Sequence, residues 1–122
     1  MITVTKHFSF EACHHLPHYV GACHKLHGHS YKLSVTVTGE IEQEGEKAGM
    51  IIDFKDLKKI VKKEVVDVLD HSYLNDIFPN PTAENMVYSI GEALRLKFDK
   101  KYKLVSVKLW ETADSYAEYI PD

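Results

Sequence analysis

The sequence contains only two cysteines among its 122 residues, Cys13 and Cys23. Small secreted domains that depend on disulfides carry more cysteines, usually in even numbers. Cys23 opens a Cys-x-x-x-His run, and Cys13 lies directly before His14. We therefore expect metal ligands or reactive thiols at these positions rather than a disulfide framework.

The chain also lacks long apolar runs. No stretch approaches the roughly 18 apolar residues that a membrane-spanning helix requires. The first residues, MITVTKHFSF, alternate apolar and polar side chains, and they contain no basic segment followed by an apolar one, which a secretory signal would show. We therefore expect a cytoplasmic protein that does not insert into membranes.

No long block of charge of one sign is present. Fifteen lysines and arginines oppose eighteen acidic residues, which gives a net charge of −3 with neutral histidines. A nucleic-acid surface normally requires clustered basic residues, so we expect no nucleic-acid partner. A small polyanionic ligand is compatible with this balance, because lysines and histidines can make one pocket locally positive.

The length fits one domain covering residues 1–122, since two domains would need a longer chain. Alternation of apolar and polar residues predicts strands at 2–11, 30–41, 103–112 and 115–120. Between the second and third strands the apolar residues recur at helical spacing. They predict two helices, which are separated by a loop over residues 70–81.

The first helix is expected to begin after Asp53, a suitable N-cap, and to run to Leu69 with Val68 on its apolar face. Its lysines are expected to form a solvated face. The second helix is expected to begin near Thr82, which is expected to be its N-cap, and to end before Lys100. The order β-β-α-α-β-β predicts an α+β fold, a four-stranded antiparallel sheet with two helices on one face.

The most unusual stretch runs from Phe10 to His29 and reads FEACHHLPHYVGACHKLHGH. It holds six of the eight histidines and both cysteines, and it connects the first two predicted strands. Long connections in compact domains are usually functional. Three imidazoles and a water molecule form the ligand set of a catalytic zinc, so we expect a transition-metal site, with zinc as the ion.

His27 and His29 are two residues apart, and in an extended chain both point to the same side. The third ligand must come from the other end of the stretch. His14 is our choice, and His15 and His18 compete with it. The alternative is a histidine-rich loop that binds nothing specific.

Cys23 lies four residues before His27, near the expected metal site. A thiol beside a metal ion and imidazoles has a lowered pKa, which suits a general base or nucleophile. The alternative for Cys23 is a buried, inert thiol. For Cys13, at the end of a strand, an inert packing role is favoured.

Two further carboxylates draw attention. Asp70 precedes His71, and such a pair can transfer protons, although many such pairs are surface or capping residues. Glu111 continues the apolar face that Val105, Val107 and Leu109 define in the third strand, where an unpaired carboxylate would be costly. It could bind two adjacent N–H donors of a heterocycle, or pair with an internal arginine or lysine.

With these residues in place, the chain resembles the 6-pyruvoyl-tetrahydropterin synthase family, and more narrowly its 6-carboxy-tetrahydropterin synthase branch, which acts in queuosine biosynthesis. The motifs that carry the resemblance, in chain order, are FEACHHLP, the Cys-x-x-x-His-Gly-His run, GMIIDF, LDHSYLN, NPTAEN and the ET of WET. The gap of three residues between Cys23 and His27 resembles the carboxy branch.

The resemblance implies a tunnelling fold in which subunit sheets form a trimeric β-barrel, two trimers stack into a homohexamer, and active sites lie between subunits. It implies zinc as the cofactor and 7,8-dihydroneopterin triphosphate as the substrate, which loses triphosphate and acetaldehyde. By position the resemblance assigns residue roles as follows: His14, His27 and His29 bind zinc, Cys23 is the base, Asp70 and His71 relay protons, Glu111 anchors the pterin, and Thr82 and Glu84 lie near the pocket.

Two rival functions remain at this stage. One is the same fold making 6-pyruvoyl-tetrahydropterin, with loss of triphosphate but no carbon–carbon cleavage. The other is a non-catalytic zinc-binding assembly module.

Overall fold

The structure is a computed structural model of the chain, and it describes residues 1–98 and 100–122. The strands are β1 (Thr3–His14), β2 (His27–Gly39), β3 (Ser72–Tyr73), β4 (Tyr102–Thr112) and β5 (Ser115–Tyr119). The helices are α1 (Phe54–Val61), α2 (Asp67–Leu69) and α3 (Ala83–Arg95), and the π-helical segment η2 (Lys62–Val66) joins α1 to α2. Among the described residues, no helix has the length and apolar character needed to cross a membrane.

The sheet has five strands in the order β3-β1-β2-β4-β5, so the prediction of four antiparallel strands is wrong in one respect. The additional strand, β3, pairs in parallel with β1 at Ala12 and Cys13. It has only two residues, too few to show the alternation by which strands are predicted. It lies within the predicted loop over residues 70–81, and that loop also contains the short helix η3 (Leu74–Asp76).

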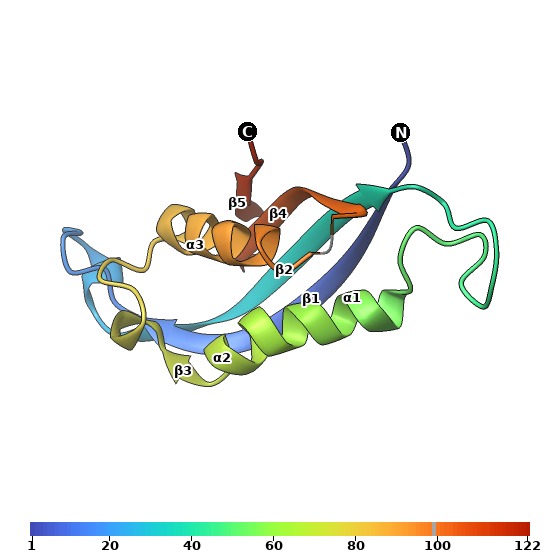
Figure 1. Cartoon of the computed structure of the whole chain (residues 1–122). Coiled ribbons are helices and arrows are strands. Elements are labelled where there is room, and N and C mark those ends of the chain that lie inside the picture. The colour runs from blue at the N-terminus through green and yellow to red at the C-terminus, as the bar shows by residue number, and fades with distance from the viewer. Residues whose placement is uncertain (99) are drawn as a thin grey trace.

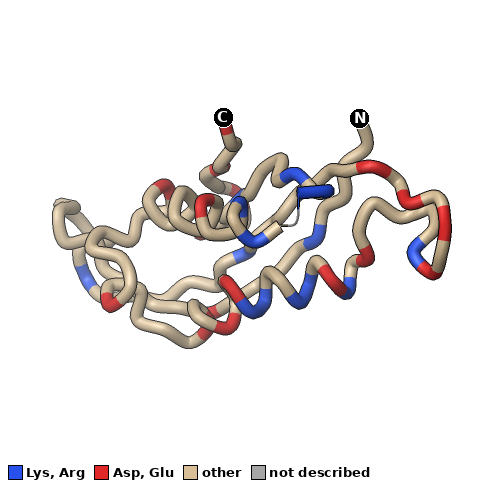
Figure 2. The backbone as a smooth tube through the Cα atoms, in the orientation of Figure 1, with Lys and Arg blue, Asp and Glu red and all other residues tan. Residues whose placement is uncertain are grey.

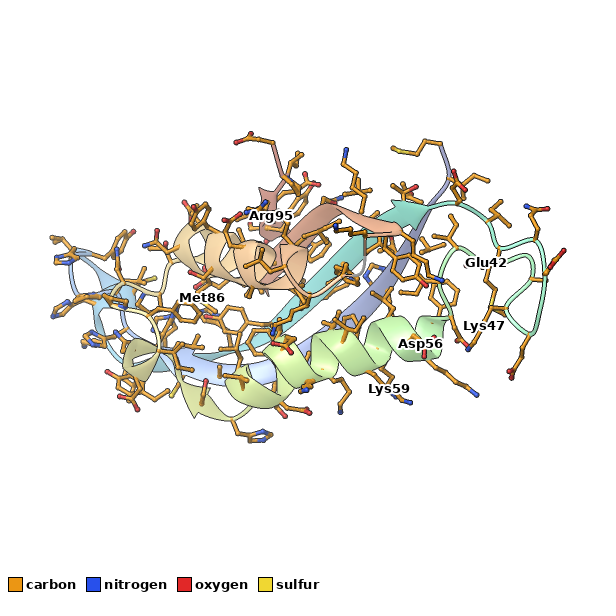
Figure 3. The ribbon with its side chains drawn as sticks, viewed as in Figure 1. Glu42, Lys47, Asp56, Lys59, Met86 and Arg95 are labelled. Carbon is orange, nitrogen blue, oxygen red and sulfur yellow. The ribbon has the colours of Figure 1, made fainter. Side chains whose placement is uncertain are left out.

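Two helical segments were predicted on one face of the sheet, and the continuous segment from α1 to α2 and the helix α3 do cover the same face (Figure 1). Asp53 accepts a hydrogen bond from the Lys55 N–H and caps α1, and Thr82 accepts one from the Asn85 N–H and caps α3. Met86 on α3, labelled in Figure 3, is fully buried between this helix and the sheet. The apolar faces of the helices thus close the core over one side of the strands.

The π-helical segment changes which valines the first helix buries. The sequence predicts Val68 in the core, but Val68 is 54% exposed, whereas Val66 is buried. A π-helical turn has i→i+5 hydrogen bonds and more residues per turn than an α-helix, so it rotates the following residues around the axis. The exposed side of α1 and η2 carries lysines, as predicted, and Lys59 points away from the sheet (Figures 2 and 3).

The apolar face predicted for β4 is wrong at Val105, because the pairing between β2 and β4 shifts its register. Val37 pairs with Leu104, whereas Val35 pairs with Val107. Leu104 is therefore buried on the helix-covered face, and Val105 is only partly buried. Beyond the shift the alternation is regular, and Val107, Leu109 and Glu111 lie on the same face.

Candidate functional site

The expected metal ligands lie on two paired strands rather than in one long connection. His14 at the end of β1 lies opposite His27 at the start of β2, and Ala12 lies opposite His29. The connection between the strands covers only residues 15–26 and includes the short helix η1 (Ala22–His24). The first strand was predicted to end too early and the second to begin too late, because histidine and glycine carry little strand signal.

Three imidazoles and one carboxylate converge on the helix-covered side of the sheet. His14 Nε2 is 3.1 Å from His27 Nε2 and 3.1 Å from Glu111 Oε1. His29 Nε2 is 3.4 Å from the same oxygen. The four ligand atoms lie within 4.8 Å of one another, and they form the one such group among the described residues. We call His14, His27, His29 and Glu111 the convergent cluster.

Two of the rings in this cluster are held through their outer nitrogen atoms. His14 Nδ1 lies 2.9 Å from the Pro81 carbonyl, and His27 Nδ1 lies 2.7 Å from the Lys25 carbonyl. A carbonyl only accepts, so both Nδ1 atoms carry a proton, and in the neutral form of each ring the lone pair lies at Nε2. Histidines that bind metals are held by this type of contact.

The donor set fits a divalent metal ion such as zinc. Lone pairs that face each other 3.1 Å apart repel unless a cation lies between them. Zinc–nitrogen bonds of about 2.0–2.1 Å place the ligands of a tetrahedral site about 3.3–3.4 Å apart, which is close to the observed separations. In addition, His29 Nε2 is buried and makes no hydrogen bond within the described residues.

The surroundings shift the pKa values of two members of the cluster. Burial lowers the pKa of His29, and this effect exceeds the opposing effect of Glu111. The contact with His14 lowers the pKa of the Glu111 carboxyl, with a smaller contribution from His29. A neutral imidazole and an ionised carboxylate are the protonation states that bind metals.

The competing histidines take no part in the cluster. His15 packs its ring against His24 and Tyr73, with ring centroids 6.3 Å apart in both pairs. His18 is exposed in the connection between β1 and β2. His14, not His15 or His18, is therefore the histidine of this region that meets His27 and His29.

Both cysteines are free thiols, so no disulfide joins them. Cys23 lies in η1 and is partly buried, and its carbonyl accepts a hydrogen bond from the Leu16 N–H. The Cys13 thiol faces the Ser72 carbonyl at 3.8 Å. Neither sulfur belongs to the convergent cluster within the described residues.

Asp70 and His71 form an ion pair, with 3.1 Å between Asp70 Oδ2 and His71 Nδ1. Asp70 Oδ1 also accepts the Glu11 N–H at 2.9 Å, and this bond is the main cause of the lowered pKa of Asp70. The His71 side chain is 81% exposed, and its backbone has a φ of 61°, which is uncommon for a residue with a side chain. His71 and His29 line the same hollow.

Glu111 borders a second hollow, which Tyr31, Trp110 and Thr112 also line. The closest side chains to its carboxylate among the described contacts are the imidazoles of His14 and His29, not the internal arginine or lysine considered as an alternative. Thr82 caps α3 directly after Pro81, whose carbonyl holds His14. Glu84 is exposed and lines a separate groove between α3 and β5.

Sequence reasoning missed the residues that hold the ligands in place. The Pro81 and Lys25 carbonyls give no sequence signal, because every residue has a carbonyl group. The Tyr31 hydroxyl, 3.3 Å from His14 Nδ1, is buried two residues after His29. Its position on the ligand-bearing face of β2 is the one signal that could have suggested it.

Comparisons with known proteins identify the family of this chain. The family model for 6-pyruvoyl tetrahydropterin synthase matches residues 3–122. The chain is 38% identical to a 6-carboxy-5,6,7,8-tetrahydropterin synthase of Haemophilus influenzae, and the alignment covers 98% of this chain and 99% of the relative. It is 42% identical to a dihydroneopterin monophosphate aldolase of Pyrococcus furiosus over 84% of this chain and 83% of the relative.

Among solved structures, the 6-pyruvoyl tetrahydropterin synthase of Caenorhabditis elegans superposes with a TM-score of 0.85 at 26% identity, covering 99% of this chain and 96% of that chain. The family match therefore extends over both the strands that carry the convergent cluster and the helices that cover it. The chain belongs to the 6-pyruvoyl tetrahydropterin synthase family.

Proposed function

We propose that this protein is a zinc-dependent lyase that converts 7,8-dihydroneopterin triphosphate to 6-carboxy-5,6,7,8-tetrahydropterin, with release of triphosphate and acetaldehyde. The observation that carries the proposal is the convergence of His14, His27 and His29 with a carboxylate on the same side of the sheet. Similarity to the Haemophilus relative over nearly the whole chain supports the carboxy-forming reaction, and with it a place in queuosine biosynthesis.

His14, His27 and His29 would hold zinc through their Nε2 atoms. When bound, zinc would supply Lewis-acid chemistry by lowering the pKa of the hydroxyl groups on the substrate side chain. We assign the fourth member of the cluster, Glu111, to substrate binding and not to zinc. Three imidazoles leave the open position that a catalytic zinc requires.

Cys23, Asp70 and His71 are proposed to move protons. Cys23 would remove a proton from the substrate side chain as a thiolate. The contact between Asp70 Oδ2 and His71 Nδ1 fixes the ring and leaves His71 Nε2 free to exchange a proton. The ionised Asp70 would also stabilise the protonated imidazole.

Glu111 is proposed to anchor the pterin. A pterin ring presents adjacent N–H donors, and an ionised carboxylate binds such donors with two parallel hydrogen bonds. The hollow beside Glu111 has aromatic side chains, Tyr31 and Trp110, in its lining. Thr82 and Glu84 would complete substrate binding, and Glu84 would do so from a neighbouring subunit because it lines another groove of its own chain.

We further propose that residues 1–122 form one domain, that six copies assemble as two stacked trimers, and that the protein works in the cytoplasm. The sheet order supports assembly through strand edges. β5 ends the sheet on one side, and on the other side β3 pairs with only two residues of β1. Strand edges of this kind can pair with another subunit.

The Pyrococcus relative supports a second candidate, cleavage of the side chain of dihydroneopterin monophosphate. A third reaction, formation of 6-pyruvoyl-tetrahydropterin, fits the same residues but leaves the carbon–carbon bond intact. The reactions differ in whether the substrate carries a triphosphate or a monophosphate, and in whether a carbon fragment leaves.

One assay separates them. The zinc-loaded protein is incubated with the triphosphate and, separately, with the monophosphate of dihydroneopterin, and acetaldehyde, triphosphate and the pterin product are measured. We expect acetaldehyde and 6-carboxy-tetrahydropterin from the triphosphate only. A pyruvoyl product without acetaldehyde, or turnover of the monophosphate alone, would replace the first proposal. If the zinc-loaded protein turns over neither substrate, the remaining interpretation is the non-catalytic zinc-binding assembly module.

A further inference from the structure

The side-chain amide of Asn75 forms hydrogen bonds with both the backbone N–H and the backbone carbonyl of His15. Asn75 Oδ1 accepts a hydrogen bond from the His15 N–H at 3.0 Å, and Asn75 Nδ2 donates one to the His15 carbonyl at 3.0 Å. A strand residue offers its neighbour the same combination of one donor and one acceptor. The side chain of Asn75 therefore extends the pairing of β1 beyond the two residues of β3.

A similar contact occurs four residues earlier on β1. Asp70 Oδ1 accepts the Glu11 N–H at 2.9 Å, and the His71 N–H donates to the Glu11 carbonyl at 2.5 Å. Between these ends, β3 pairs with Ala12 and Cys13. The segment 70–75, which we call the β1 clamp, thus fixes the backbone on both sides of His14, within β1 and just after its end.

The clamp bears directly on the convergent cluster. His14 is its fully buried member, and its ring is confined by the Pro81 carbonyl and the Tyr31 hydroxyl. A rotation or slip of the β1 backbone would move Nε2 away from His27 and Glu111, because the ring cannot compensate within this packing. Residues 13 and 15, on either side of this ligand, are both held by the clamp.

We propose that Asn75 is a positioning residue that fixes the metal ligand His14 by binding the backbone N–H and carbonyl of the next residue, His15. The inference rests on the proposed role of His14 in metal binding. It also links the two parts of the proposed site, since the segment that carries Asp70 and His71 is the segment that aligns His14.

Only a side-chain amide supplies the acceptor and the donor that these two hydrogen bonds require. Aspartate would place a second oxygen where Asn75 Nδ2 now faces the His15 carbonyl, and two acceptors would repel each other. Alanine would leave both the N–H and the carbonyl of His15 without their present partner. Asn75→Ala and Asn75→Asp are therefore expected to weaken metal binding in the same direction for different reasons.

The test measures zinc affinity by competition with a chelator, and the visible absorption spectrum of the cobalt-substituted protein, for the full chain. Asn75→Ala and Asn75→Asp should lose about 10- to 100-fold in zinc affinity, the usual effect of removing an outer-sphere contact, and should alter the cobalt bands. Asn75→Gln keeps the amide on a longer side chain, and it provides a milder variant with the same expected direction if the other two do not fold.

Thr5→Ala is the matched control. It removes the 2.7 Å hydrogen bond between Thr5 and Thr36, at the opposite end of β1, and it should leave zinc affinity and the cobalt spectrum unchanged. Wild-type zinc affinity and cobalt bands in the Asn75 variants, or an equal loss in Thr5→Ala, would overturn the inference. Undiminished zinc affinity in His14→Ala would instead overturn the proposed metal site.

Discussion

Cys23 and the three converging histidines come from one stretch of sequence, but the structure separates them. His14, His27 and His29 direct Nε2 to one point, whereas no cysteine sulfur lies among the clustered ligand atoms of the described residues. A thiol outside the ligand set is available for the proton transfer proposed for Cys23. This difference can be tested on a single side chain.

Cys23→Ala is expected to retain zinc and to lose turnover by about 10²-fold or more, the usual contribution of a general base. Zinc content is measured by metal analysis and turnover by acetaldehyde release. Cys13→Ala is the matched control and should retain both, because the Cys13 thiol contacts only the Ser72 carbonyl among its described polar contacts. Loss of zinc from Cys23→Ala would show that Cys23 is a ligand and not a base.

At the scale of elements, α3 and β5 are joined by a close aromatic contact. The Tyr119 ring lies directly over Gly91, where an added Cβ would come within 2.2 Å of a ring carbon. The Tyr119 hydroxyl donates to Glu92, which also accepts a hydrogen bond from Arg95. These contacts fix β5, the edge strand, against the helix.

Gly91→Ala is expected to destabilise the fold by about 1–3 kcal/mol, because the added methyl group must displace the Tyr119 ring or move α3 away from the sheet. Urea unfolding at neutral pH measures the change in free energy. Ser89→Ala changes an exposed position of the same helix and should remain within about 0.5 kcal/mol of the wild type. An equally stable Gly91→Ala protein would show that the ring moves aside freely.

At the scale of the whole molecule, one chain does not bring all of the proposed residues together. Glu84 lines a groove apart from the convergent cluster, and His71 is mostly exposed. The proposed assembly would account for both positions, because a neighbouring subunit would complete the site.

Mixed assemblies test this arrangement. Cys23→Ala and His71→Ala proteins, each expected to be inactive alone, are dissociated, mixed in equal amounts and allowed to reassociate. If Cys23 of one subunit works with His71 of its neighbour, about a quarter of the sites receive both intact residues, and about a quarter of the activity should return. If the two residues act within one chain, no mixture can combine them, and the activity will stay at the level of the separate variants.

The sequence by itself determined the four longer strands, both helices with their caps at Asp53 and Thr82, and the shared direction of His27 and His29. Each of these depends on residues close together in the chain, where periodicity and capping act locally. Only the tertiary structure decided that His14 lies opposite His27, that Glu111 reaches the same point from β4, and that Asn75 and the Pro81 carbonyl hold this arrangement. Those contacts join residues far apart in sequence, and they depend on strand register and helix packing, which local patterns do not encode.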